Sequence, residues 1–157
     1  MVELIEKWID QTLMNYSNQM KSCECLTERL HGYYSEEFLS KCNYVVLDKV
    51  PIIDTQELRQ AGLGKFIDME FNGITYKNVY FIKKGFENDL AMHFHELVHV
   101  LQWQYLGTKE FIARYINELQ QHGYEEAPLE IMAYSLEKDF RNNSQRINIQ
   151  KYVKNSI

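Results

Sequence analysis

Two histidines four residues apart enclose a glutamate in the sequence His95-Glu96-Leu97-Val98-His99. On an α-helix, positions i and i+4 lie on one face, one turn apart, so the two imidazoles can reach a single metal ion. Zinc suits imidazole and carboxylate ligands, and a catalytic zinc site keeps one position for water. Glu96 would project to the neighbouring side, where it could take the proton of that water. The motif therefore predicts one zinc ion with Glu96 as general base.

The context of the motif is helical. Only 5 of the 157 residues are histidine, so this spacing rarely arises by chance. The spacing of apolar residues predicts a helix over 90–106, with Asn88 or Asp89 as its N-cap. His93 would point to a different face from His95, as an ordinary residue near the start of this helix. The face that carries the two ligands is expected to turn towards a partner element.

A third protein ligand must come from later in the chain, because catalytic zinc sites usually have three. Carboxylates occur just before and within the next but one predicted helix, at Glu125, Glu126 and Glu130. Glu130 is favoured because it lies inside this helix, beside its apolar stripe. Ala133 follows on the same side, and a small residue there lets the helix approach its neighbour closely. Glu125, Glu126 and His122, which lies near a predicted helix end, remain alternatives.

No motif specifies the residue that would stabilise the transition state. The candidates for this role are polar or aromatic residues of the same region, namely Tyr134, Tyr124, His122 and Arg114. Gln102 could hydrogen-bond a metal ligand or the substrate, or it could lie on the helix surface. For the tyrosines, His122 and Arg114, a packed aromatic ring or a solvated polar side chain is the simpler explanation.

Three segments together resemble the gluzincins, the zinc metallopeptidases that use His, His and Glu as ligands. These segments are HELVHVLQWQYLG (95–107), FIARY (111–115) and GYEEAPLEIMAY (123–134), and they resemble most the small, largely uncharacterised gluzincin domains of bacteria. The resemblance, which covers about residues 92–137, implies that His95, His99 and Glu130 bind zinc and that Glu96 is the base. It also implies a zincin-like fold, in which an edge strand lies above the active-site helix and pairs with an extended peptide.

The sequence departs from two related patterns. The metzincin pattern has glycine and histidine where this chain has Gln102 and Tyr105, which excludes that class. The larger gluzincins carry Asn and Asp around the third ligand, at the positions of Leu129 and Tyr134 here. The residues that orient the two histidines are therefore not assigned by the resemblance.

The chain predicts a single α+β domain over residues 1–157, with a small sheet containing antiparallel strands, followed by a helical half. The metal-site core is expected at about 66–140. Besides the motif helix, apolar spacing predicts helices over 3–20, 108–123 and about 128–140, and a short helix capped by Asp54-Thr55.

The predicted strands lie before the motif helix. A strand is expected over 44–53, interrupted by Pro51. The segments 65–71 and 74–82 predict a hairpin around Asn72-Gly73, because Asn-Gly is the preferred type I′ turn. The polar residues 21–43 and 141–157 predict, respectively, short helical pieces and a trailing segment of uncertain order.

Composition excludes several classes of function. The net charge of −5 disfavours broad electrostatic binding to nucleic acid. No segment approaches the roughly 20 apolar residues of a membrane helix, and the N-terminus lacks the apolar core of a signal peptide. The expected compartment is the cytoplasm, with signal-independent export as the alternative. The number of cysteines is odd and small, and the spacing of Cys23, Cys25 and Cys42 predicts neither a disulfide framework nor a metal site.

These patterns predict a zinc-dependent metallopeptidase that hydrolyses peptide bonds of a peptide or protein substrate. The first rival is a regulatory or interaction module that keeps zinc and does not turn over. The second rival is a metal-free α+β domain with a chance motif. The sequence leaves the cleavage preference and the oligomeric state open.

Overall fold

The computed structural model describes all residues from Met1 to Ile157. The α-helices are α1 (Val2–Asn15), α2 (Glu36–Ser40), α3 (Gln56–Leu58), α4 (Gly64–Ile67), α5 (Leu90–Leu106), α6 (Thr108–His122), α7 (Pro128–Arg141) and α8 (Ile149–Ser156). The strands are β1 (Lys21–Ser22), β2 (Asn43–Leu47), β3 (Gly73–Tyr76) and β4 (Val79–Lys83). Two 3₁₀ helices, η1 (Ser17–Gln19) and η2 (Cys23–Leu26), and a π-helical segment, η3 (Arg59–Leu63), complete the structure. The fold class is α+β, as predicted. No helix combines the length and the apolar character needed to span a membrane.

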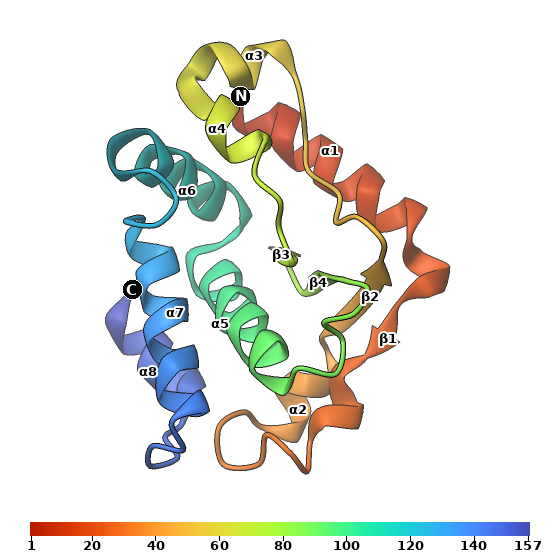
Figure 1. The fold of residues 1–157 in the computed structure, drawn as a ribbon, viewed down its shortest axis with the longest axis vertical. Helices are drawn as coiled ribbons and strands as arrows, with labels where there is room; N and C mark the ends of the chain where they lie inside the picture. Colours follow the sequence, from red (N-terminus) through yellow and green to blue (C-terminus); the bar gives the residue numbers. More distant parts are fainter.

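The sheet has the strand order β1-β2-β4-β3. Strands β2 and β4 are parallel, whereas β1 pairs with β2 and β3 pairs with β4 in antiparallel fashion. Strand β3 is therefore an edge strand, and it packs against α5 together with β4. Helix α5 runs through the middle of the molecule, with the sheet on one side and α7 on the other (Figure 1).

A hairpin forms over 73–83, but both of its strands fall largely within the segment predicted as the second strand alone, and its turn is different. Tyr76 pairs with Val79, so the turn is Lys77-Asn78, and Lys77 takes the positive φ of 59°. Asn72-Gly73 instead leads into β3, where contact with α5 fixes the strand. The segment predicted as the first hairpin strand begins with α4. The strand predicted over 44–53 ends at Leu47, whose partner Lys83 is the last residue of β4.

The motif helix has the predicted limits. Helix α5 starts at Leu90, and the Asp89 carboxylate caps it by accepting a hydrogen bond from Ala91 N at 3.1 Å. It ends at Leu106 and is followed by the C-cap Gly107, whose φ of 85° suits glycine. Thr55 also caps a short helix, as predicted, by accepting from Leu58 N. Helix α1 is shorter than predicted and ends at Asn15.

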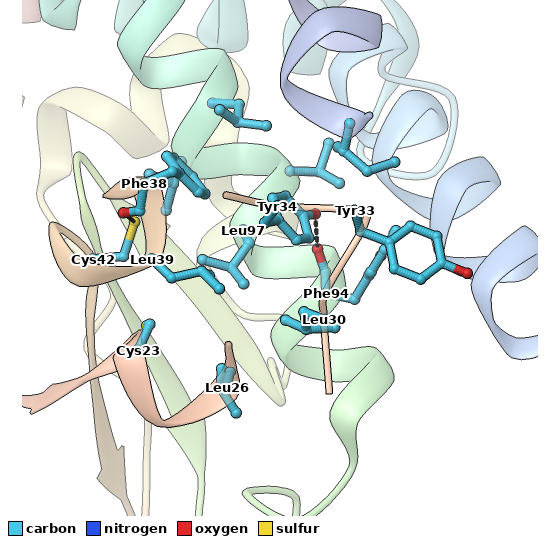
Figure 2. Close-up of a cluster of buried hydrophobic side chains, with 14 of the residues drawn as sticks. Cys23, Leu26, Leu30, Tyr33, Tyr34, Phe38, Leu39, Cys42, Phe94 and Leu97 are labelled. Atoms are coloured by element: carbon cyan, nitrogen blue, oxygen red, sulfur yellow. Dashed lines mark hydrogen bonds between the residues drawn. The ribbon is translucent and has the colours of Figure 1, made fainter. Parts of the chain in front are cut away.

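Both polar segments contribute to the core. Buried side chains from 21–43 pack against α5, and Figure 2 shows Leu26, Leu30 and Tyr34 among them. The Tyr34 hydroxyl donates to the carbonyl oxygen of Phe94 at 2.9 Å (Figure 2). The trailing segment forms helix α8, which packs on α5 and buries Ile149 and Val153. Both segments thus help to hold the motif helix in place.

The three cysteines are free thiols. Cys23 and Cys42 are buried in the core cluster, and Cys25 is exposed. Burial raises the pKa of the Cys23 thiol to about 12, against the opposing effect of its hydrogen bond with the Tyr80 hydroxyl. These contacts are those of ordinary packed thiols.

Candidate metal centre

Three donor side chains converge between α5 and α7. The Nε2 atoms of His95 and His99 lie 3.2 Å apart. Glu130 Oε1 lies 3.5 Å from His95 Nε2 and 3.3 Å from His99 Nε2. All three side chains are buried, and together they could hold a metal ion.

The packing of α7 explains how Glu130 reaches the two histidines. Pro128 occupies the first position of α7, which suits a residue without an N–H group. Glu118 of α6 accepts a hydrogen bond from Leu129 N at 2.8 Å, so α6 fixes the start of α7. Ala133 is fully buried, and its small side chain permits the close contact between α5 and α7. Glu130, one turn earlier, is thereby directed at α5.

The other candidates for the third ligand lie elsewhere. His122 at the end of α6 is exposed, and so are Glu125 and Glu126 in the loop before α7. None of the three belongs to the group formed by His95, His99 and Glu130. The structure therefore brings only Glu130, of the candidates considered, to the histidine pair.

A carboxylate that the sequence analysis missed orients His95. Glu137 Oε1 lies 2.9 Å from His95 Nδ1, and its other oxygen accepts from Arg141 Nε at 2.7 Å. Arg141 in turn pairs with the Asp89 carboxylate at 2.9 Å. Since a carboxylate accepts, the Nδ1 atom of His95 carries a proton, so the neutral ring would offer its Nε2 lone pair to a metal ion. The sequence did offer one signal for Glu137, because it lies two turns after Glu130 on the same helix.

Gln102 orients His99, which settles one of the two roles considered for it. Gln102 is fully buried, and its Nε2 donates to the carbonyl oxygen of Leu129 at 3.0 Å. Its Oε1 therefore faces His99 Nδ1, at 2.8 Å, and accepts the proton of that ring nitrogen. The lone pair of His99 Nε2 is left for the site, as in His95. Both rings are held in the tautomer that binds a metal through Nε2.

Glu96 lies beside the donor group and under the edge strand. Its Oε2 is 3.9 Å from His95 Nε2, whereas its Oε1 accepts a hydrogen bond from the Thr75 hydroxyl at 2.9 Å. A Cβ atom at Gly73 would lie 3.0 Å from Glu96 Oε2. Burial raises the pKa of the Glu96 carboxyl group, because it disfavours the charged form. Strand β3 thus holds one carboxylate oxygen and leaves the other facing the metal group.

Glu130 is held by a further residue that the sequence did not indicate. The Tyr115 hydroxyl of α6 donates to Glu130 Oε2 at 2.7 Å. Burial opposes ionisation of Glu130, but the neighbouring charge of His99 and hydrogen bonds from both histidines outweigh it and lower its pKa. Burial likewise opposes protonation of His95, and hydrogen bonds with Glu130 and Glu137 raise its pKa to about 10. Protons and a metal cation would thus compete for this site.

The remaining candidates for transition-state stabilisation, Tyr134, Tyr124 and Arg114, make contacts of different kinds. The ring of Tyr134 packs edge-on against His95, with centroids 4.5 Å apart, and its hydroxyl is 3.0 Å from that of Tyr124. Arg114 donates to Glu118 at 3.0 Å and so supports the start of α7.

His93 has a structural role, as its position predicted. Its Nε2 donates to the carbonyl oxygen of Glu87 at 2.8 Å. Its Nδ1 therefore accepts from the Tyr80 hydroxyl, at 2.7 Å. Both ring nitrogens are satisfied away from the metal group, so His93 is not available as a ligand.

The donor set fits a zinc ion. Two imidazoles and a carboxylate form a usual set of protein ligands for catalytic zinc. Donors bound at about 2.0–2.1 Å in a tetrahedron lie about 3.3 Å from one another. The observed separations of 3.2, 3.3 and 3.5 Å agree with this value.

Comparisons with protein families, curated proteins and solved structures find no match for this chain.

Proposed function

We propose that this protein is a zinc-dependent metallopeptidase with a zincin-like fold. The observation that carries the proposal is the convergence of His95 Nε2, His99 Nε2 and Glu130 Oε1, with the free oxygen of Glu96 beside them. Both rings are oriented by hydrogen-bond partners, the half-buried Glu137 and the buried Gln102, so that their lone pairs face the same point. Such a preorganised site is what metal-assisted hydrolysis requires.

Bound zinc would supply Lewis acidity, lowering the pKa of a water molecule at its open position and polarising the carbonyl group of the substrate. In the proposed reaction, Glu96 Oε2 takes up a proton from the attacking water and passes it to the leaving amine. Thr75 keeps Oε1 in place, so the carboxylate cannot rotate away from the reacting atoms. The low exposure of Glu96, at 4%, excludes bulk water from this proton transfer.

A peptide is the proposed substrate because β3 is an edge strand of the sheet. This strand pairs only with β4 and lies next to Glu96 on α5. An extended peptide can add to such an edge through main-chain hydrogen bonds. Pairing of this kind would bring a peptide bond close to the metal group.

The test compares Glu96→Gln with Glu126→Gln, a matched control in the exposed loop before α7. With an unfolded protein as substrate, Glu96→Gln should keep one zinc per chain and lose about 10²–10⁴-fold in turnover. Glu126→Gln should keep both zinc and turnover. Full activity of Glu96→Gln would refute the proposed mechanism.

A second candidate is a zinc-binding regulatory module without turnover. The observation that favours it is burial: His95, Glu96, His99 and Glu130 are each at most 5% exposed. This candidate predicts one zinc per chain in the wild-type protein and no hydrolysis of unfolded proteins, with or without chelator. The peptidase predicts hydrolysis that a chelator abolishes and zinc restores.

A further inference from the structure

A cavity of about 100 Å³ adjoins the metal group. His95, Glu96, His99 and Glu130 form part of its wall, and Gly73 and Thr75 of β3 form another part. The cavity therefore begins where a substrate would be attacked. A substrate group that sits next to the reacting bond could enter it directly.

The rest of the wall is apolar. Of the 24 residues that line the cavity, 18 are hydrophobic, and the other six are the metal-group and β3 residues just named. Helix α6 supplies Ile112 and Ile116, and α1 supplies Ile5 and Ile9. Helix α1 packs against α6, so the N-terminal helix completes the pocket. The only ionisable side chains among the polar residues of the wall are those of Glu96 and of the metal group.

We propose that this cavity receives one aliphatic side chain of the substrate, from a residue adjacent to the scissile bond. The inference rests on the proposed peptidase function and adds its substrate preference. Leucine, isoleucine, valine and methionine satisfy the apolar wall. An aspartate side chain would be buried without a cationic partner, which is strongly unfavourable. A lysine side chain would find only the carboxylates of Glu96 and Glu130, which the proposed reaction and the metal group already use.

Cavity volume limits the size of this side chain. An apolar protein cavity of about 150 Å³ accommodates benzene. The cavity here, at about 100 Å³, is smaller and is bounded by side chains of α1 and α6 that pack in the core. An aromatic side chain would force these helices apart, and overpacking of a core is destabilising. The preference is therefore for aliphatic over aromatic residues.

The test measures binding, and does not depend on turnover. Dissociation constants of leucine, glycine, phenylalanine and lysine hydroxamates for the zinc-loaded protein are determined by calorimetry, since the hydroxamate group chelates zinc. A single methylene in a hydrophobic pocket changes affinity by about 10-fold or more. Leucine hydroxamate should thus bind at least about tenfold more tightly than the glycine compound, and more tightly than the other two.

Two variants test whether the preference for the leucine compound arises at the cavity. Ile116→Phe, at a half-buried position of α6, should reduce the ratio between the glycine and leucine dissociation constants because it fills the cavity. Ile131→Phe, at a position of α7 that is 46% exposed and outside the cavity, should leave the ratio unchanged.

The outcomes separate the two proposals. Equal affinities for the leucine and glycine compounds would overturn the assignment of the cavity, while the binding itself would support the metal centre. Tighter binding of the phenylalanine compound would overturn the size limit and with it the aliphatic preference. If zinc does not load and no hydroxamate binds, both the metal centre and the cavity assignment are overturned.

Discussion

The backbone of Gly73 in the edge strand passes directly over the carboxylate of Glu96 in the motif helix. A methyl group on Gly73 would lie 3.0 Å from Glu96 Oε2 and 3.1 Å from the carboxyl carbon. Two residues later, Thr75 points to the same face of β3 and donates to Glu96 Oε1. The strand thus limits the position of one oxygen by steric contact and fixes the other by a hydrogen bond.

Gly73→Ala should impair turnover and preserve zinc binding. The added methyl group must push Glu96 aside by a few tenths of an ångström. Rates are sensitive to such shifts, since a misplacement of about 1 Å can cost about 10²-fold. Turnover and zinc content are measured together. The matched control is Gly64→Ala in α4, where the nearest atom to the new methyl group is the end of the Arg59 side chain, 3.8 Å away. Equal turnover of the two variants would show that this contact does not position the base.

Glu137→Ala should weaken zinc binding by about 10–100-fold, because His95 loses the partner that fixes its tautomer and ring orientation. Competition with a chromophoric chelator gives the zinc affinity. Asp139→Ala is the control, since this carboxylate lies on the same helix but is exposed to solvent and has no side-chain hydrogen bond. A zinc affinity of Glu137→Ala as high as that of the control would mean that His95 needs no such partner.

Ile149→Ala tests whether α8 belongs to the fold. Ile149 is 1% exposed in the core cluster on α5, and truncation of a buried isoleucine costs about 2–5 kcal/mol. The free energy of unfolding is measured in urea. Ile147→Ala, at a position that is 40% exposed, should change it by no more than about 0.5 kcal/mol. Similar small losses for both variants would place α8 outside the cooperative core.

The parts of the structure that sequence predicts best are those with local signals. The limits of α5 follow from a cap at Asp89, a glycine at position 107 and regular apolar spacing between them. Glu130 was favoured for its place inside the next but one helix, beside a small Ala133, and the structure brings it to the histidines. In each of these cases, residues within a few turns of one another carry the information.

The wrong predictions concern contacts between distant residues. Asn72-Gly73 has the preferred turn sequence, yet Gly73 is needed where β3 crosses Glu96, so the turn moves to Lys77-Asn78. The segment 141–157 was predicted to be a trailing segment of uncertain order, but it contains helix α8. The sequence signal was weak because α8 buries only Ile149 and Val153, one turn apart, in an otherwise polar stretch. Tertiary packing decides both, and it leaves little trace in local composition.

The partners of the metal group were partly accessible from sequence. Gln102 lies three residues after His99 on one helix, and its contact with His99 was one of two roles considered. Glu137 and Tyr115 were missed, because their relation to His95 and Glu130 depends on how α6 and α7 pack on α5. A search for carboxylates two turns after Glu130 would have found Glu137.

The zinc content of the purified protein tests the central claim most directly. The wild-type chain and Glu126→Gln should each bind one zinc ion, because Glu126 is exposed in the loop before α7. Glu130→Gln should bind zinc much more weakly, since an amide replaces the buried carboxylate beside His95 and His99. If the wild-type protein takes up no zinc, even after zinc is added back, the metal centre does not exist and the peptidase proposal falls with it.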